Sequence, residues 1–327
     1  MADLHTSYLG LQLKNPLIAA SCGLTNSVDS IKKLAEYGIG AVVLKSLFEE
    51  QILFHANQKI TENQLDYPEA YDYIKNYTKT FEINNYLTLI REAKKAVTIP
   101  VIASINCISA NEWVSFAKEI EQAGADALEL NIMHLGSNEK QKAENIENKL
   151  FDIIHKVREY TKLPIAVKLS NHYTSLSNIL IKIDWNKLVQ GVVLFNRQYM
   201  PDIDIDKKKV TAGQIFSHPG EYSESLRWIA LLSNKVKFDL AATTGIWDGK
   251  TVIKQILAGA KAVQIASVLY QKGPEVIKTM LSELEQWMIA NNVYKIEDFR
   301  GQMSMHNIEN PASYERIQFM RYFSHIE

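Results

Sequence analysis

Cysteine is scarce in this sequence, with only Cys22 and Cys107 among its 327 residues. Two cysteines exclude a disulfide-stapled scaffold and favour a reducing compartment. They also exclude an iron–sulfur cluster built from this chain alone, because such clusters take four cysteine ligands. Since free cysteine behaves mostly as a small buried apolar residue, we expect structural roles for both thiols. No metal site is predicted.

Long hydrophobic runs and an excess of one charge are also missing. No stretch approaches the roughly 20 apolar residues that a membrane-spanning helix requires, and the first five residues lack the basic flank and apolar run of a signal peptide. Lysine and arginine total 36 against 37 acidic residues, a net charge of −1, so the sequence lacks the basic excess typical of nucleic-acid binding. We therefore expect a cytoplasmic protein that binds neither membrane nor nucleic acid.

What the sequence does contain is an eightfold alternation of short apolar runs with amphipathic segments. The runs are continuously apolar, as in parallel strands that are covered on both faces. They lie at 17–20, 41–44, 100–105, 127–132, 164–169, 191–195, 238–242 and 262–266. Helical patterns begin at Val28 and then occupy 82–97, 110–122, 143–161, 175–188, 223–234, 248–258 and 273–291. Eight such units predict an α/β fold, a closed (β/α)8 TIM barrel, with an open doubly wound sheet as the alternative.

Three segments fall outside this repeat. Residues 49–80 form a long insert rich in Asn, Gln and Tyr, and loops of this length are usually functional or poorly ordered. Residues 201–217 carry three aspartates and then three lysines, which predicts a strand or hairpin with a solvated turn. Residues 294–327 form a polar C-terminal extension with a helical pattern at 314–323. Because no linker interrupts the chain, we expect one domain spanning residues 1–327.

Polar residues gather at the predicted strand ends, where barrels of this kind place their active sites. They are Ser21, Lys45, Ser46, Asn106, Cys107, Asn131, His134, Lys168, Asn171, Asn196, Arg197, Thr243, Thr244, Gly245 and Ser267. Lys45 and Lys168 each follow an apolar strand, and a buried lysine requires an anionic or polar partner. That partner could be Glu129, solvent, a carbonyl substrate held as a Schiff base, or an anionic cofactor. The residues leave these alternatives open.

The seventh and eighth strands run through small residues into a helix, as at a phosphate site. Thr243, Thr244 and Gly245 follow one strand, and Ser267 follows the next. Small residues let backbone N–H groups approach a phosphate, and helix N-termini favour anions. A role in turns and helix caps would explain either segment alone. Their pairing after strands seven and eight of a barrel predicts phosphate binding.

A series of short motifs follows the order and strand-end placement of one known family. They are Asn15-Pro16, Ala20-Ser21, Lys45-Ser46, Leu130-Asn131, Val167-Lys168-Leu169, Phe195-Asn196, Thr244-Gly245-Ile246, Ala258-Gly259-Ala260, Val263-Gln264-Ile265 and the run from Ile296 to Gly301. In these motifs the chain resembles dihydroorotate dehydrogenases, over nearly its whole length. It is similar to their class 1 branch, because no N-terminal membrane-associating helix is present.

The resemblance implies an FMN flavoprotein that oxidises dihydroorotate to orotate in pyrimidine biosynthesis. Hydride would pass from a C–C bond next to a carbonyl to flavin N5, and a base would remove a proton from the adjacent carbon. The family pattern places FMN against Ala20, Ser21, Lys45, Ser46, Asn131, Lys168, Ser217, Thr244, Gly245, Ala266 and Ser267. It places the substrate against Lys45, Asn106, Asn131 and Asn196. Lys168 would stabilise negative charge at the pyrimidine end of the reduced flavin. A homodimer is also implied, whereas the electron acceptor is not.

The proton-removing base is where the chain departs from the family. The usual Asn-Leu-Ser-Cys-Pro-Asn, whose cysteine is the base, is replaced at residues 131–138 by Asn-Ile-Met-His-Leu-Gly-Ser-Asn. His134 takes the position of that cysteine, and histidine is a competent base near neutral pH. We assign the catalytic roles to His134 and Lys45, with Ser137 as the alternative base. The departure leaves open another substrate, a non-catalytic flavin- or phosphate-binding barrel, and a Schiff-base lyase.

Overall fold

The computed structural model describes residues 2–48, 68–106, 114–198 and 200–315. Within these ranges, eight parallel strands form a single sheet around a common axis. They are β3 (Leu17–Ala19), β4 (Ala41–Val43), β6 (Val101–Asn106), β7 (Ala127–Ile132), β8 (Ile165–Leu169), β9 (Gly191–Leu194), β12 (Asp239–Ala242) and β13 (Ala262–Ile265). β4 pairs with both β3 and β6, so the sheet closes on itself. The closed barrel confirms the predicted (β/α)8 fold and excludes the open doubly wound sheet. A short strand, β5 (Leu47–Phe48), adds to β6 beyond β4.

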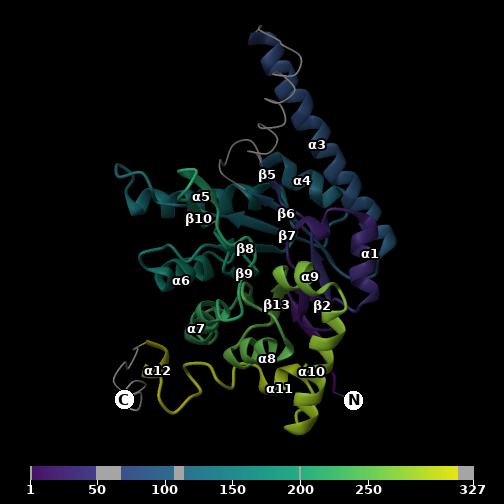
Figure 1. The fold of residues 1–327 in the computed structure, drawn as a ribbon, viewed down its shortest axis with the longest axis vertical. Coiled ribbons are helices and arrows are strands. Elements are labelled where there is room, and N and C mark those ends of the chain that lie inside the picture. The colour runs from purple at the N-terminus through teal and green to yellow at the C-terminus, as the bar shows by residue number, and fades with distance from the viewer. Residues whose placement is uncertain (1, 49–67, 107–113, 199, 316–327) are drawn as a thin grey trace.

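Helices connect successive strands and cover the outside of the barrel (Figure 1). The longer ones are α1 (Val28–Glu36), α3 (Pro68–Ala96), α4 (Val114–Gln122), α5 (Ala143–Tyr160), α6 (Leu176–Asn186), α7 (Tyr222–Leu232), α8 (Gly249–Ala258) and α10 (Val276–Ala290). The shorter ones are η1 (Gly23–Thr25), α9 (Ser267–Lys272), α11 (Ile296–Phe299) and α12 (Ala312–Glu315). No helix in the described part of the chain is both long enough and apolar enough to cross a membrane.

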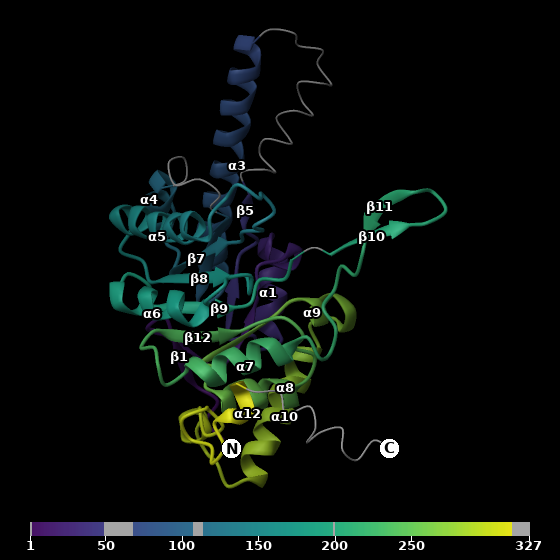
Figure 2. The same ribbon diagram turned by 90° about the vertical axis from the view of Figure 1, so that its left-hand side faces the viewer.

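Helix α3 is longer than predicted. The apolar pattern predicts a helix over 82–97, whereas α3 begins at Pro68 and ends at Ala96. Its N-terminal turns project beyond the barrel (Figures 1 and 2), whereas Tyr86, Leu87 and Ile90 pack into the core from its C-terminal half. The predicted insert is therefore helical at 68–80, and its other residues, 49–67, lie outside the described ranges.

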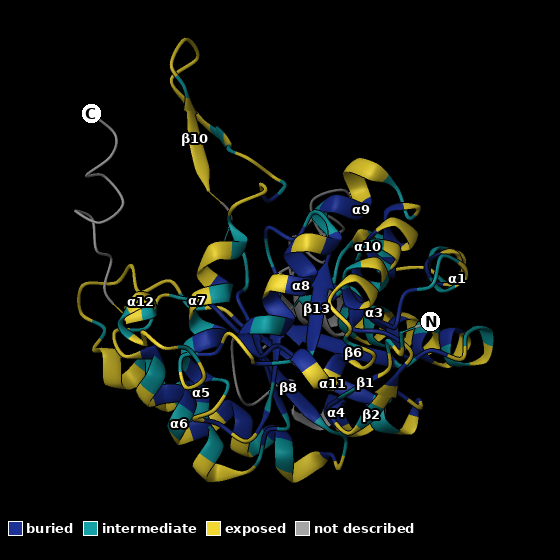
Figure 3. Cartoon of the chain, turned by 90° about the horizontal axis from the view of Figure 1, so that it is seen from below, coloured by how far each residue is buried: buried dark blue, intermediate teal, exposed yellow. Residues whose placement is uncertain are grey.

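The N-terminal end of the barrel is closed by a hairpin that the sequence patterns do not predict. Strands β1 (Thr6–Tyr8) and β2 (Leu11–Leu13) pair antiparallel, and the Leu9 N–H donates to the Asp239 carboxylate at 2.8 Å, at the start of β12. The hairpin packs against the inward-facing side chains Ile18, Ala41, Val43, Ile102, Ala127, Ala166, Val193, Ala241 and Ala262. Figure 3 shows the buried strands at the centre of the molecule and the exposed faces of the helices around them.

The insert at 201–217 contains the predicted hairpin. Strands β10 (Pro201–Asp204) and β11 (Lys209–Ala212) pair antiparallel and project away from the barrel (Figure 2). We call residues 201–212 the arm. Its Ile203, Ile205 and Val210 are 66%, 80% and 75% exposed, which leaves apolar side chains on both strands and in the turn without a core to cover them.

Candidate active site

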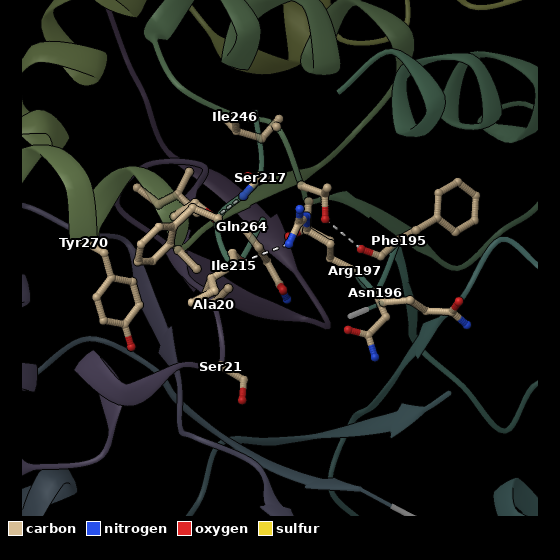
Figure 4. Close-up of a pocket in the computed structure, with 18 of the residues that line it drawn as sticks. Ala20, Ser21, Phe195, Asn196, Arg197, Ile215, Ser217, Ile246, Gln264 and Tyr270 are labelled. Carbon is tan, nitrogen blue, oxygen red and sulfur yellow. Dashed lines mark hydrogen bonds between the residues drawn. The ribbon is translucent and has the colours of Figure 1, made fainter. Parts of the chain in front are cut away.

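A cavity of about 570 Å³ opens at the carboxyl ends of β3, β8, β9, β12 and β13 (Figure 4). Its walls are Ala20, Ser21, Lys168, Phe195, Asn196, Arg197, Gln198, Gln214, Ile215, Phe216, Ser217, Thr243, Thr244, Gly245, Ile246, Gln264, Ile265, Ala266, Ser267 and Tyr270. Most of the predicted site residues therefore line one space. The exceptions are Lys45, Ser46, Asn106, Asn131 and His134, which lie outside this wall.

The turn after β12 has a backbone that requires glycine. Thr244 and Gly245 both have φ of +74°. A Cβ on Gly245 would lie 2.3 Å from the backbone nitrogen of Tyr222, at the start of α7. The Thr244 hydroxyl donates to the Phe195 carbonyl oxygen at 3.1 Å, which joins this turn to the end of β9. The turn is thus fixed on two sides where it borders the cavity.

The turn after β13 is joined to the residues that follow the arm. The Ser217 N–H donates to Ser267 Oγ at 3.0 Å. Among the described residues, the N–H groups of Thr244, Gly245 and Ala266 have no backbone acceptor. Unpaired backbone donors beside a cavity are the groups that bind phosphate. The two turns therefore have the chemistry expected of the predicted phosphate site.

Lys168 supplies a positive charge to the cavity wall from a largely buried position. The residue is 7% exposed, and its Nζ donates to Gln264 Oε1 at 3.1 Å. Glu129 Oε1 lies 3.9 Å from the same nitrogen. The structure thus gives Lys168 both a polar partner and a nearby carboxylate, while the side chain still borders the cavity.

The three predicted asparagines lie at neighbouring strand ends. Asn196 belongs to the cavity wall, whereas Asn106 and Asn131 lie outside it. Asn106, Asn131 and Lys168 are neighbours across the ladder from β6 to β8. The Asn196 amide nitrogen donates to Asn131 Oδ1 at 2.5 Å. Asn106 and Asn131 are 6% and 8% exposed, so both amides are held at the strand ends rather than in solvent.

Ser46 lies behind the wall and fixes Ser21 within it. The Ser46 hydroxyl bonds to Ser21 Oγ at 2.9 Å and to Ser104 Oγ at 2.7 Å, and its N–H donates to Ser21 Oγ at 2.8 Å. Lys45 is half-buried, and its N–H donates to the Thr25 carbonyl oxygen at 3.4 Å. These bonds hold the segment after β4 against the segment after β3.

His134 lies in the loop after β7 and outside the main cavity. Its Nε2 is 3.2 Å from Gln141 Oε1. It borders a crevice of about 40 Å³ together with Ile146 and Tyr173. Ser137, the alternative base, is exposed in the same loop. The structure therefore does not bring either candidate base into the wall of the main cavity.

Arg197 organises the part of the wall next to the arm, a role that the sequence did not reveal. Its Nε donates to Glu221 Oε2 at 3.0 Å, and its Nη1 donates to the carbonyl oxygens of Gln214 and Ile215, each at 2.9 Å (Figure 4). These bonds connect the chain entering the arm with the chain leaving it. An adjoining cavity of about 520 Å³ shares this arginine and extends to the start of α7.

Cys22 does not line the cavity. It is half-buried after β3, and burial raises the pKa of its thiol, which hydrogen bonds to Tyr270, a wall residue. A raised pKa keeps the thiol protonated and poorly nucleophilic, as expected for a structural cysteine. Cys107 lies outside the described residues.

Comparisons with known proteins place similarity along most of this chain. A family model described as dihydroorotate dehydrogenase matches residues 3–288. The chain is 27% identical to the dihydroorotate dehydrogenase B (NAD(+)) catalytic subunit of Thermoplasma volcanium, covering 92% of this chain and 98% of that protein. The protein of the same name from Thermoplasma acidophilum is 26% identical, with 92% and 99% covered. A putative dihydroorotate dehydrogenase A (fumarate) of Aeropyrum pernix is 24% identical, with 91% and 97% covered.

Proposed function

Since the chain belongs to the dihydroorotate dehydrogenase family, we propose that it binds FMN and oxidises dihydroorotate, or a closely similar ring, in pyrimidine biosynthesis. The observation that carries this proposal is a cavity with two phosphate-type turns at one side and a buried lysine in its wall. Its volume of about 570 Å³ lies within the range of small-molecule sites.

The wall residues fit FMN. The unpaired N–H groups of Thr244, Gly245 and Ala266, with Ser267, would hold the phosphate. Ala20 and Ser21 would run along the ring, and the Lys168 ammonium would stabilise negative charge on it. When bound, FMN supplies the hydride acceptor for oxidation of a C–C bond next to a carbonyl.

The asparagine pair suits a ring that carries amide groups. The bond from Asn196 to Asn131 leaves the Asn131 nitrogen as a donor and the Asn196 oxygen as an acceptor, with no other partner for either among the described residues. An orotate-like ring offers N–H and C=O groups that match both. We propose Asn106, Asn131 and Asn196 as substrate ligands and Lys45 as the cation for the substrate carboxylate and for catalysis.

We propose His134 as the base. Because His134 lies outside the wall of the main cavity, this role requires the loop at 133–142 to close over a bound ring. Its contact with Gln141, within the same loop, would orient the imidazole as the loop moves. The departure of residues 131–138 from the family pattern favours a second candidate function, oxidation of a different ring by the same site.

We also propose that the protein is cytoplasmic and that each chain is a single FMN-binding domain. Two chains would form a homodimer, with the arm in the interface. The two strands of the arm pair with each other, and its exposed isoleucines, Ile203 and Ile205, alternate with the aspartates that precede the three lysines. Asp204 pairs with Lys207 of the same arm at 3.5 Å, so Asp202 and Asp206 of one copy would face Lys208 and Lys209 of another in a two-fold arrangement. Such a self-complementary charge pattern favours a second copy as the partner.

Anaerobic mixing of the flavin-loaded protein with dihydroorotate tests the activity. Bleaching of the flavin absorbance would support the proposal, and purified protein without bound FMN would contradict it. Bleaching by dithionite but not by dihydroorotate would indicate that the site oxidises a different ring compound. Reoxidation should then be compared for NAD⁺ and fumarate, because the names of the relatives carry both.

A further inference from the structure

A carboxylate lies in the interior of the barrel, where charge is costly. Glu129 is in the middle of β7 and is 1% exposed. A buried carboxylate is stable only if a positive charge or hydrogen bonds compensate it. Glu129 Oε2 accepts a hydrogen bond from Gln264 Nε2 at 2.6 Å, whereas Oε1 has no hydrogen-bond partner among the described residues.

Gln264 connects this carboxylate to Lys168. It lies on β13, is 1% exposed, and accepts from Lys168 Nζ through Oε1 while donating to Glu129 through Nε2. The amide orientation follows from its partners, because an ammonium only donates and a carboxylate only accepts. The three side chains therefore form one hydrogen-bonded line from the barrel interior to the cavity wall.

Glu129 is the carboxylate that balances Lys168. The direct separation between Lys168 Nζ and Glu129 Oε1 is 3.9 Å. Asp239, at the opposite end of the barrel, is already paired with Lys261 at 2.8 Å and with the Leu9 N–H. No other carboxylate in the described chain lies within ion-pair distance of Lys168. Without Glu129, the ammonium would keep only a neutral amide as its buried partner.

We propose that Glu129 is a positioning residue: through Gln264 it fixes the Lys168 ammonium at the cavity wall and balances its charge. This inference rests on the proposed function, because it is the bound flavin that would experience the charge. Glu129 itself does not line the cavity. Its effect on the flavin is therefore expected to pass through Lys168.

Sulfite tests this proposal without substrate turnover. Sulfite adds to oxidised flavin and brings a negative charge, so its affinity reports the positive charge held near the ring. Sulfite dissociation constants, measured by bleaching of bound FMN, should rise on the order of tenfold or more in Glu129→Gln, where the ammonium loses its fixed position, and in Lys168→Met, where the charge is lost. The double variant should be no weaker than Lys168→Met alone. Glu297→Gln, which removes a carboxylate of α11 that pairs with Arg300 away from the cavity, is the control and should leave sulfite affinity unchanged.

Exchanging the carboxylate at position 129 with the amide at position 264 distinguishes charge balance from packing. The variant Glu129→Gln/Gln264→Glu keeps one carboxylate and one amide in the line and places the carboxylate directly against Lys168. It should restore sulfite affinity to within a few fold of wild type. It also remains informative if Glu129→Gln alone does not fold.

Three results would overturn the proposal in distinguishable ways. Bound FMN with unchanged sulfite affinity in Glu129→Gln would remove Glu129 from the site while leaving the proposed function intact. A weakened single variant that the exchange does not rescue would show that Glu129 acts by packing and not as a counter-charge. Wild-type protein that binds no FMN would contradict the proposed function first and this inference with it.

Discussion

The side chain of Asn196 donates a hydrogen bond to that of Asn131, which links the ends of β9 and β7 across the intervening β8. Lys168 lies on β8 between them, level with Asn131 in the strand ladder. The two amides and the ammonium are thus positioned as one group by the register of three parallel strands.

Asn131→Ala and Asn196→Ala should each raise KM for dihydroorotate on the order of tenfold, because each removes one ligand and leaves the other amide without its partner. The double variant should lose less than the product of the two effects, since the residues act as a pair. Steady-state kinetics measure both quantities. Asn186→Ala, at the exposed end of α6, is the control and should behave as wild type. Fully multiplicative losses would show that the amides act independently.

His134→Ala should slow anaerobic reduction of the flavin by dihydroorotate on the order of 10²–10⁴-fold, the usual contribution of a general base. Stopped-flow absorbance measures this rate at saturating substrate. Ser137→Ala, in the same loop, should leave the rate unchanged. The reverse pattern would assign proton removal to Ser137, and two normal rates would exclude both residues.

Gly245→Ala should weaken FMN binding and lower the melting temperature of the apoprotein. The substitution is strained by about 1–3 kcal/mol because φ is positive, and the new Cβ would also meet the Tyr222 nitrogen. Gly10→Ala is a matched control, because Gly10 has φ of +77° but no atom within 4 Å of the added Cβ. The two variants separate backbone strain from steric overlap. Equal effects on FMN affinity would contradict a specific role for the turn after β12.

Tyr173→Phe should stabilise the protein by about 1 kcal/mol, because the phenol oxygen is buried and lacks a hydrogen-bond partner. Burial first, and the charge of Glu147 second, raise the pKa of Tyr173 from 10.0 to about 12. The neutral phenol therefore favours the folded state fully below pH 10, and this contribution falls as the pH rises toward 12. Wild type should lose more stability than the variant across this window in chemical denaturation. Tyr160→Phe, at an exposed position, should change neither the free energy of unfolding nor its dependence on pH.

Ile205→Lys combined with Val210→Lys should convert a dimer into monomers, because it places charge on the most exposed apolar side chains of the arm. Light scattering after size-exclusion chromatography gives the mass. Trp185→Ser changes an equally exposed apolar residue on α6 and should leave the mass unchanged. A wild-type monomer would contradict the proposed homodimer.

The barrel could be predicted because its signal is local. β7 spans the same residues as the predicted strand, 127–132. A short, mostly apolar run between two helical patterns is typical of a parallel strand that is covered on both faces. The first part of α3 could not be predicted from apolar periodicity, because it projects beyond the barrel instead of lying along it. The strands β1 and β2 have three residues each, too few to show a pattern.

The site could be predicted where it depends on strand ends. Ala20, Lys168, Thr244 and Ser267 line one cavity because parallel strands all end at the same edge of the barrel. The connections between them could not be predicted. Glu129 and Gln264 are 135 positions apart, and Arg197 binds carbonyl oxygens, which carry no side-chain signature. Such hydrogen bonds depend on how distant strands and loops are placed in the folded barrel.

The arm offers the protein a separable unit of variation. Both of its roots, at 196–198 and 214–217, belong to the cavity wall, and Arg197 ties one root to the other. These bonds do not involve residues 201–212, so a change of length or charge confined to the arm would leave them in place. The residues that project from the barrel can therefore vary in evolution independently of the residues that line the cavity.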